Sequence, residues 1–103
     1  MSNGAFQVNC VHEEKGKEII STLTASPELP QATLRIGDAP TKSFNVVAVT
    51  PIEIRIELSR SAFFVETLVI DRRKAADMRT ITTDGDGRVL SERAAEGCTL
   101  KSL

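Results

Sequence analysis

The chain has 103 residues, of which 41% are hydrophobic and 26% are charged, and its formal net charge is −1. A chain of this size folds as one domain with a core of its own, so we predict a single β-domain over residues 1–103, with residues 1–4 disordered or derived from expression. The balance of 13 basic and 14 acidic residues, with four phenylalanines and neither tryptophan nor tyrosine, argues against nucleic-acid binding. No apolar run approaches the ~20 residues that span a bilayer, so we predict no membrane insertion.

The first residues, MSNGAFQ, lack the basic start and apolar middle of a signal peptide. This leaves two alternatives: a cytoplasmic protein, or an exported protein whose signal was removed and replaced by a starting methionine. Cys10 and Cys98 lie near opposite ends of the chain, whereas metal and redox motifs usually contain a close pair such as C-x-x-C. Two distant cysteines favour a structural disulfide, and we therefore predict a periplasmic or secreted location.

A first hairpin is predicted by two β-forming stretches, residues 6–13 and 18–25, on either side of a tight turn at Lys15 and Gly16. Pairing the two residues that flank this turn gives one apolar face, which carries the first cysteine. The expected pairs are Glu14 with Lys17, His12 with Ile19, Cys10 with Ser21, Val8 with Leu23 and Phe6 with Ala25.

The middle of the chain predicts four further strands. The prolines of SPELP end the first hairpin, and residues 32–36 and 43–50 follow as strands, the second of which is apolar on both faces and therefore central. Residues 52–59, IEIRIELS, alternate without error and predict the most secure strand. Its hairpin partner is predicted over residues 63–71, with Ile56 opposite Val65 and Arg55 opposite Glu66.

The stretch TTDGDGRVLSE, residues 82–92, suggests either a calcium loop or a turn. With Gly87 at the sixth place of a calcium loop, the twelfth place falls on Arg93, a cation where a bidentate glutamate is needed. We therefore interpret Asp84 and Asp86 as turn residues of a last hairpin. The expected pairs are Thr83 with Arg88, Ile81 with Leu90 and Arg79 with Glu92.

Two segments stay ambiguous at the level of sequence. Residues 71–78 predict either a helical turn capped by Asp71 or a solvated loop, and residues 91–97 predict either a short helix or irregular structure. Counting the remaining elements gives seven or eight strands. The predicted fold class is all-β: a single-domain antiparallel β-sandwich or small β-barrel built from hairpins.

A family resemblance follows from three stretches: FQVNC near the start, ETLVIDRR before a polar hairpin, and GCTLKSL at the close. Together they resemble small exported β-proteins of Gram-negative bacteria, in which a first-strand cysteine is bridged to one near the C-terminus. The layout is similar to that of periplasmic inhibitors of C-type lysozyme. The resemblance implies export and a binding or inhibitor-like role. It carries over no inhibitory residues, because the chain lacks the Ser-Gly plus aromatic segment of those inhibitors.

Catalytic chemistry finds little support. His12 is the only histidine, and Cys10 beside it lies among valines rather than in the electropositive setting that activates a thiol. A zinc site at Cys10, His12 and Glu14 with Cys98 is conceivable, but same-face residues on a strand lie roughly 7 Å apart and do not converge on a metal. No serine-nucleophile or phosphate-loop motif is present. We predict no enzyme, no metal site and no cofactor.

One cluster of basic residues is a candidate for binding an anion or an acidic protein partner: Arg72, Arg73, Lys74 and Arg79. The alternative is a solvated turn that protects a sheet edge. Two functional hypotheses follow. The first is a non-enzymatic exported binding or inhibitor-like module of a bacterial envelope. The second is a cytosolic or virion structural subunit that forms homo-oligomers through exposed strand edges.

Overall fold

The computed structural model describes residues 4–74 and 77–103, and within these ranges the chain forms strands and turns without any helix. The all-β fold class is therefore confirmed, although nine strands are present instead of seven or eight. The expectation for residues 1–3 lies outside the described residues. The strands are β1 (Phe6–Glu14), β2 (Lys17–Ala25), β3 (Gln31–Ile36), β4 (Lys42–Val49), β5 (Glu53–Arg60), β6 (Phe64–Asp71), β7 (Met78–Asp84), β8 (Val89–Ala94) and β9 (Cys98–Ser102).

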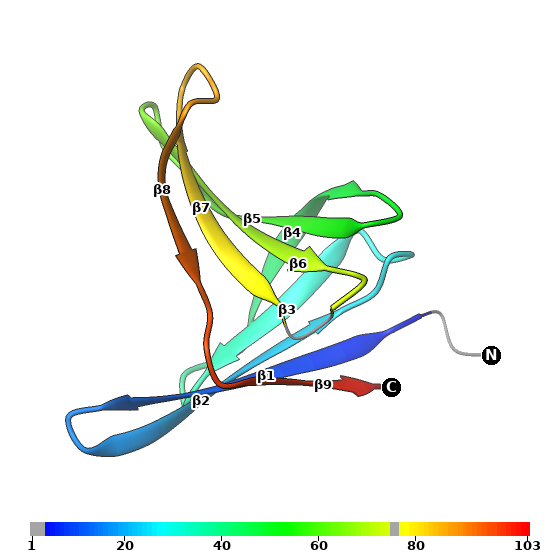
Figure 1. Ribbon diagram of the computed structural model, residues 1–103, viewed down its shortest axis with the longest axis vertical. Helices are drawn as coiled ribbons and strands as arrows, with labels where there is room; N and C mark the ends of the chain where they lie inside the picture. The colour runs from blue at the N-terminus through cyan, green and yellow to red at the C-terminus, as the bar shows by residue number, and fades with distance from the viewer. Residues whose placement is uncertain (1–3, 75–76) are drawn as a thin grey trace.

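All nine strands belong to one antiparallel sheet in the order β8-β7-β6-β5-β4-β3-β2-β1-β9, which curls into a half-barrel (Figure 1). Of the two predicted architectures, the sandwich is wrong, because the strands of the described residues form a single sheet. The last two strands are one stretch of chain that leaves β7 and joins β1. At the crossing, Ala95 N–H donates to Met78 O, and Gly97 O accepts the N–H of Val11.

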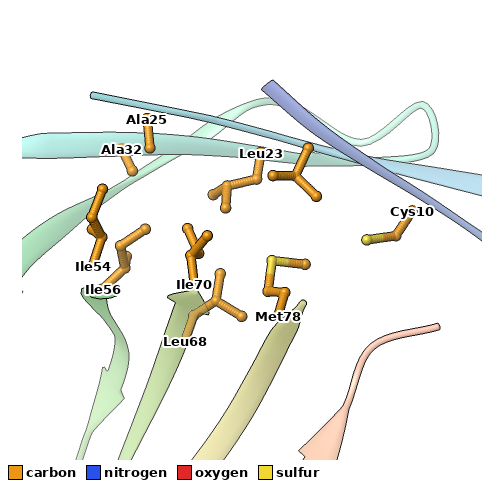
Figure 2. Close-up of a cluster of buried hydrophobic side chains, with 10 residues drawn as sticks. Cys10, Leu23, Ala25, Ala32, Ile54, Ile56, Leu68, Ile70 and Met78 are labelled. Atoms are coloured by element: carbon orange, nitrogen blue, oxygen red, sulfur yellow. The ribbon is translucent and has the colours of Figure 1, made fainter. Parts of the chain in front are cut away.

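The hydrophobic core lies on the concave face, where the curl brings strands β1 to β3 opposite strands β5 to β7 (Figure 2). Alternation along each strand places one side chain in two on this face. Phe6, Leu34, Phe44 and Leu58 pack around its margin. The buried members of the cluster are Val8, Cys10, Leu23, Ala25, Ala32, Ile54, Ile56, Leu68, Ile70 and Met78.

The first hairpin has the predicted register at every pair, from Phe6 with Ala25 to Glu14 with Lys17. Lys15 and Gly16 form its turn with φ angles of 51° and 78°. A two-residue type I′ turn requires a positive φ at both of its central residues, and the twist of such a turn matches the right-handed twist of the flanking strands. The short turn leaves no freedom to slip.

The β5–β6 hairpin forms as predicted, but its register differs. Ile56 lies opposite Leu68 and Arg55 opposite Val69, because the connection is longer than two residues and the ladder shifts between Glu57 and Ser59. Such a shift marks a β-bulge, which adds a residue on one strand and cannot be read from alternation alone.

The β7–β8 hairpin is also confirmed with a different register. Ile81 lies opposite Glu92 because the ladder shifts between Thr82 and Thr83. Arg79 is paired with Ala94, although its side chain still reaches Glu92 across the diagonal. The stretch at 91–97 that could have been helical continues β8 as far as Ala94 and then crosses to β9.

Strand β4 occupies the predicted central position, between β3 and β5. Its two apolar faces have different surroundings, however. Phe44 and Val46 pack against the core, whereas Val47 and Val49 are exposed beyond the register shift that follows Val46. The apolar side chains on both faces therefore predicted the position of β4 in the sheet but not the burial of each side chain.

Candidate functional site

The predicted disulfide is confirmed and joins the first strand to the last. Cys10 and Cys98 are directly paired on β1 and β9, with their sulfur atoms 2.03 Å apart. The hydrogen bond from Val11 to Gly97 lies beside this pair, so the cysteines occupy a non-hydrogen-bonded position, where facing residues approach most closely. We name the meeting point of β1, β7 and the β8–β9 crossing the junction; its residues are Cys10, Met78, Ala95, Gly97 and Cys98.

Gly97 is required by the geometry of the junction. Its φ is +66°, and a Cβ atom built on it would lie 2.7 Å from the backbone oxygen of Val11. The left-handed conformation disfavours any side chain, and the approach to Val11 leaves no room for one. A glycine immediately before the cysteine therefore lets the chain turn from β8 onto β1.

The disulfide removes both sulfur atoms from the chemistry considered above. Neither Cys10 nor Cys98 is a thiolate that can attack a substrate or bind zinc. His12 lies near the exposed tip of the β1–β2 hairpin, with Nε2 4.0 Å from a carboxylate oxygen of Glu14. Both side chains are exposed to solvent, and in the described parts of the chain no cluster of three metal-ligating residues forms.

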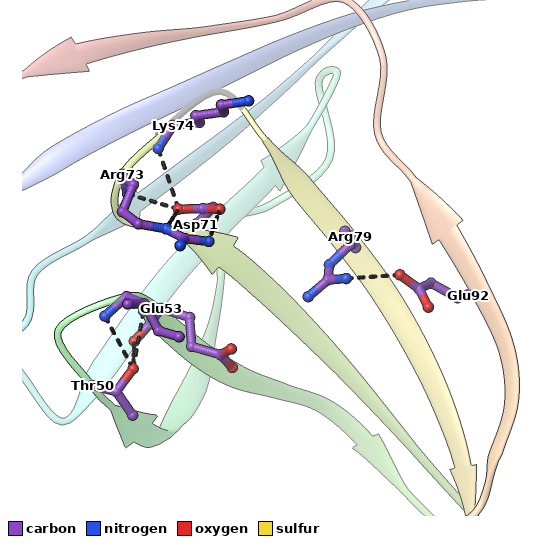
Figure 3. A network of polar contacts seen from close by, with 8 residues as sticks. Thr50, Glu53, Asp71, Arg73, Lys74, Arg79 and Glu92 are labelled. Carbon is purple, nitrogen blue, oxygen red and sulfur yellow. Dashed lines mark hydrogen bonds and ion pairs between the residues drawn. The ribbon is translucent and has the colours of Figure 1, made fainter.

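The arginines of the basic cluster form hydrogen bonds and ion pairs with neighbouring residues of the protein (Figure 3). Asp71, the last residue of β6, accepts the side-chain N–H groups of Arg73 at 3.1 and 3.2 Å. It also accepts the backbone N–H groups of Arg73 at 2.7 Å and of Lys74 at 3.2 Å. The hydrogen bond from the Arg73 side chain is the main cause that lowers the pKa of Asp71 to about 2, and the same contact raises the pKa of Arg73.

The other two arginines of the cluster also have partners. Arg72 donates from Nη1 to the backbone oxygen of Thr50 at 2.6 Å, and Arg79 pairs with Glu92 at 2.9 Å. Unlike the three arginines of the cluster, the Lys74 side chain forms no ion pair or hydrogen bond with a described residue. In the described residues 72–74 the segment after β6 forms no helix, and Asp71 accepts its backbone N–H groups; residues 75–76 of this segment lie outside the described residues.

The structure brings Arg73 and Arg79 to the same small hollow, of about 160 Å³, above the buried side chain of Val69. Three carboxylates share this hollow with the two guanidinium groups: Glu53, Asp71 and Asp77. An anion entering it would meet more negative than positive charge. The anion site thus stays a prediction, with a local charge balance that disfavours it.

A second candidate surface, absent from the sequence predictions, lies where the β5–β6 and β7–β8 hairpins end side by side (Figure 1). We name it the tip surface; its residues are Phe63, Phe64, Val89 and Leu90. Their exposed fractions are 73%, 53%, 55% and 50%. Phe64 lies opposite Asp84 on β7, and Val89 lies opposite the neighbouring Thr83, so both hairpins contribute to one end of the sheet, with Phe64 and Val89 on its two faces.

The turns beneath the tip surface are held by polar side chains. Ser61 Oγ accepts the backbone N–H groups of Phe63 and Phe64 at 3.3 and 3.1 Å. Asp84 Oδ1 accepts those of Asp86 and Arg88, both at 2.9 Å. These are local turn motifs, which position the chain without using the apolar side chains.

One signal in the sequence could have revealed this surface. Two adjacent phenylalanines on a strand point to opposite faces, so a sheet with a single covered face must leave at least one of them in solvent.

Comparison with protein-family models, with curated proteins and with solved structures gives no match. The resemblance to lysozyme inhibitors therefore stays a prediction, and any function must be argued from the geometry.

Proposed function

We propose that this protein is a non-enzymatic, exported β-domain that binds a protein partner in an oxidising compartment such as a bacterial envelope. The tip surface is the observation that carries the proposal. Large apolar side chains gathered on an exposed surface mark sites of protein interaction, and aromatic side chains contribute most of the binding energy at such sites. The rings of Phe63 and Phe64, with centroids 6.4 Å apart, provide a compact aromatic anchor.

The position of the tip surface fits the proposed role. The two hairpins project from the sheet, so a partner can contact Phe63 and Leu90 without disturbing the core (Figure 1). Their turns are already ordered by Ser61 and Asp84, which reduces the entropy lost when a partner binds. An inhibitor-like role is a narrower form of the same proposal, in which the tip enters a cleft of an enzyme.

The disulfide supports the exported location, because such bonds persist in oxidising compartments and are rare in the cytosol. Alkylation followed by mass spectrometry of protein taken from its native compartment tests this part of the proposal. We expect Cys10 and Cys98 to be protected from alkylation until a reductant is added. Two freely alkylated thiols would refute export.

Photo-crosslinking tests the binding role. A photoreactive phenylalanine analogue at position 63, introduced in the native host, should yield one discrete crosslinked protein. The same analogue at Phe44, a partly buried core-margin residue on β4, is the control and should yield none. A crosslinking pattern at position 63 that does not differ from the control would contradict the proposal.

A structural subunit is the second candidate function, and the free edges of β8 and β9 favour it, because unpaired edges can join sheets of different copies. Light scattering distinguishes the two candidates. A stable closed oligomer with both thiols reduced in the native compartment would favour the structural subunit, whereas an oxidised monomer would favour the binding module.

A further inference from the structure

The outer edge of β8 has backbone groups that no strand in the described ranges satisfies. Ala95 N–H bonds to β7, and alternation therefore directs the backbone groups of Arg93 and Ser91 toward β7 as well. The N–H and C=O groups of Glu92 and Ala94 point the other way, to the free side of the sheet. Every residue of β8 is exposed, so this edge is accessible.

The other edge of the sheet, at β9, borders a hollow. Leu100 and Ser102 line a hollow of about 280 Å³ whose remaining walls come from the molecule itself, residues 4–6, Pro27 and residues 70–72. An added strand beside Leu100 and Ser102 would have to share this hollow. The edge of β8, where every residue is exposed, is the one that an extended partner segment can reach without entering this hollow.

The charges along β8 indicate what kind of segment would pair with it. Glu92 is already neutralised by Arg79 at 2.9 Å. Arg93 on β8 and Arg88, which directly precedes the strand, form no side-chain ion pair with any residue in the described ranges, so two unpaired positive charges lie on or beside this edge. An acidic partner segment would complement this edge, whereas a second copy of β8 would bring two more unpaired arginines to it.

We propose that the free edge of β8 binds an extended acidic segment of a partner protein as an added antiparallel strand. The inference rests on the proposed function, because it names the chemistry of the partner. The backbone of Glu92 and Ala94 forms the new ladder, and a carboxylate of the partner lies opposite Arg93. Val89 and Leu90 continue the contact onto the tip surface. Main-chain pairing supplies affinity and side chains supply specificity, as in other cases of strand addition.

Peptide binding tests the inference directly. Two synthetic peptides serve as probes, one with alternating valine and glutamate and one with alternating valine and lysine. Measured by fluorescence anisotropy, the glutamate peptide should bind at least about tenfold more tightly than the lysine peptide. A tenfold difference in affinity corresponds to roughly 1.4 kcal/mol of binding free energy. Amide hydrogen exchange should slow at Glu92 and Ala94 when this peptide binds. Equal affinity for the two peptides, or no slowing at these amides, would overturn the inference.

Ala94→Pro is the decisive variant, because it removes a backbone N–H that points away from β7 and therefore leaves the internal ladder intact. We expect it to remain folded by circular dichroism and to lose binding at least tenfold. Ala94→Ser, which retains the N–H, should bind like the wild type. Arg93→Glu should reverse the preference between the peptides, and Lys101→Glu on the opposite edge should not. A folded Ala94→Pro variant with wild-type affinity would refute strand addition.

The outcomes separate this inference from the proposed function. If crosslinking at position 63 captures a partner in both the wild type and Ala94→Pro, the binding role stands and the β8 ladder is refuted. If no partner is captured at position 63 but the glutamate peptide binds as described, the role of the tip surface is refuted and the edge site stands. Self-association in sedimentation that is lost in Ala94→Pro would make a second copy the occupant and overturn the acidic partner.

Discussion

The junction and the tip surface are built by opposite means. At the junction, residues 88 positions apart in sequence are joined by a covalent bond, a close backbone approach at Gly97 and the apolar core. At the tip surface, local turns held by Ser61 and Asp84 position exposed apolar side chains that pack on no core. The difference separates stability from recognition: side chains at the tips can change without unfolding the half-barrel, whereas the junction tolerates little.

The largest expected effect is at the disulfide. Replacing both cysteines, Cys10→Ala with Cys98→Ala, should lower the free energy of unfolding by about 4 kcal/mol, because a long loop in the unfolded chain is no longer closed. Urea denaturation measures this change, and the wild type with and without reductant is the matched comparison. An unchanged denaturation midpoint would mean that hydrogen bonds alone hold β9 against β1.

Gly97→Ala should have the next largest effect, with a loss of about 2 kcal/mol of unfolding free energy, because the new Cβ meets the oxygen of Val11 in a strained conformation. Gly87→Ala is the matched control. Gly87 also has a positive φ, of +84°, but nothing lies within 4 Å of its built Cβ. Equal losses in the two variants would show that the backbone angle matters and the close approach to Val11 does not.

Phe63→Ser tests the tip surface. It should change the unfolding free energy by no more than about 0.5 kcal/mol, as is usual for a surface substitution. The crosslink to a partner from a photoreactive residue placed at Phe64 should be lost in the same variant. Thermal denaturation and crosslinking measure the two effects. A loss of stability similar to that at the junction would show that the tip ring takes part in folding.

The smallest expected effect is the pH dependence of the turn after β6. Because Arg73 lowers the pKa of Asp71 from 3.8 to about 2, Asp71 contributes stability that is present above its unfolded pKa and is lost as the pH falls toward about 2. Asp71→Asn should therefore flatten the stability profile between about pH 4 and pH 2. A carboxyl NMR titration measures the pKa itself.

Two arginine variants sharpen this prediction. Arg73→Gln should raise the pKa of Asp71 toward its ordinary value, because the side-chain hydrogen bond that lowers it most is removed. Arg72→Gln, which removes a donor to Thr50 instead, should leave the titration of Asp71 as it is. Equal shifts in the two variants would point to general charge instead of the direct contact.

Alternation and turn chemistry predicted the fold class, the hairpins and the register of the first hairpin. The Lys15–Gly16 turn has only one compatible pairing, and this is why its register could be read from sequence. The other two hairpins contain ladder shifts, near Leu58 and Leu90, that depend on how the sheet curls. Curling is a property of the whole sheet, so neither shift could be read from the local pattern.

The candidate sites likewise include features that the local sequence predicts and features that depend on the whole fold. The disulfide followed from two distant cysteines, and the Arg79–Glu92 pair was found in spite of an incorrect register, because long side chains reach a diagonal neighbour. The basic cluster was read from charge alone, although Asp71 directly precedes it and binds Arg73. The tip surface was missed because burial of Phe63 depends on whether a second layer of structure covers that end of the sheet.

The pairing of β9 with β1 also sets the order in which this molecule can be completed during synthesis. Phe6 lies opposite Ser102, so its backbone partner is made almost a full chain length later on the ribosome. Strands β1 to β8 can pair with their sequential neighbours as they emerge, whereas one side of β1 must wait for the last strand. Such distant pairing slows folding. Until β9 is made, the unpaired edge of β1 is the part of the nascent chain that a chaperone would have to protect.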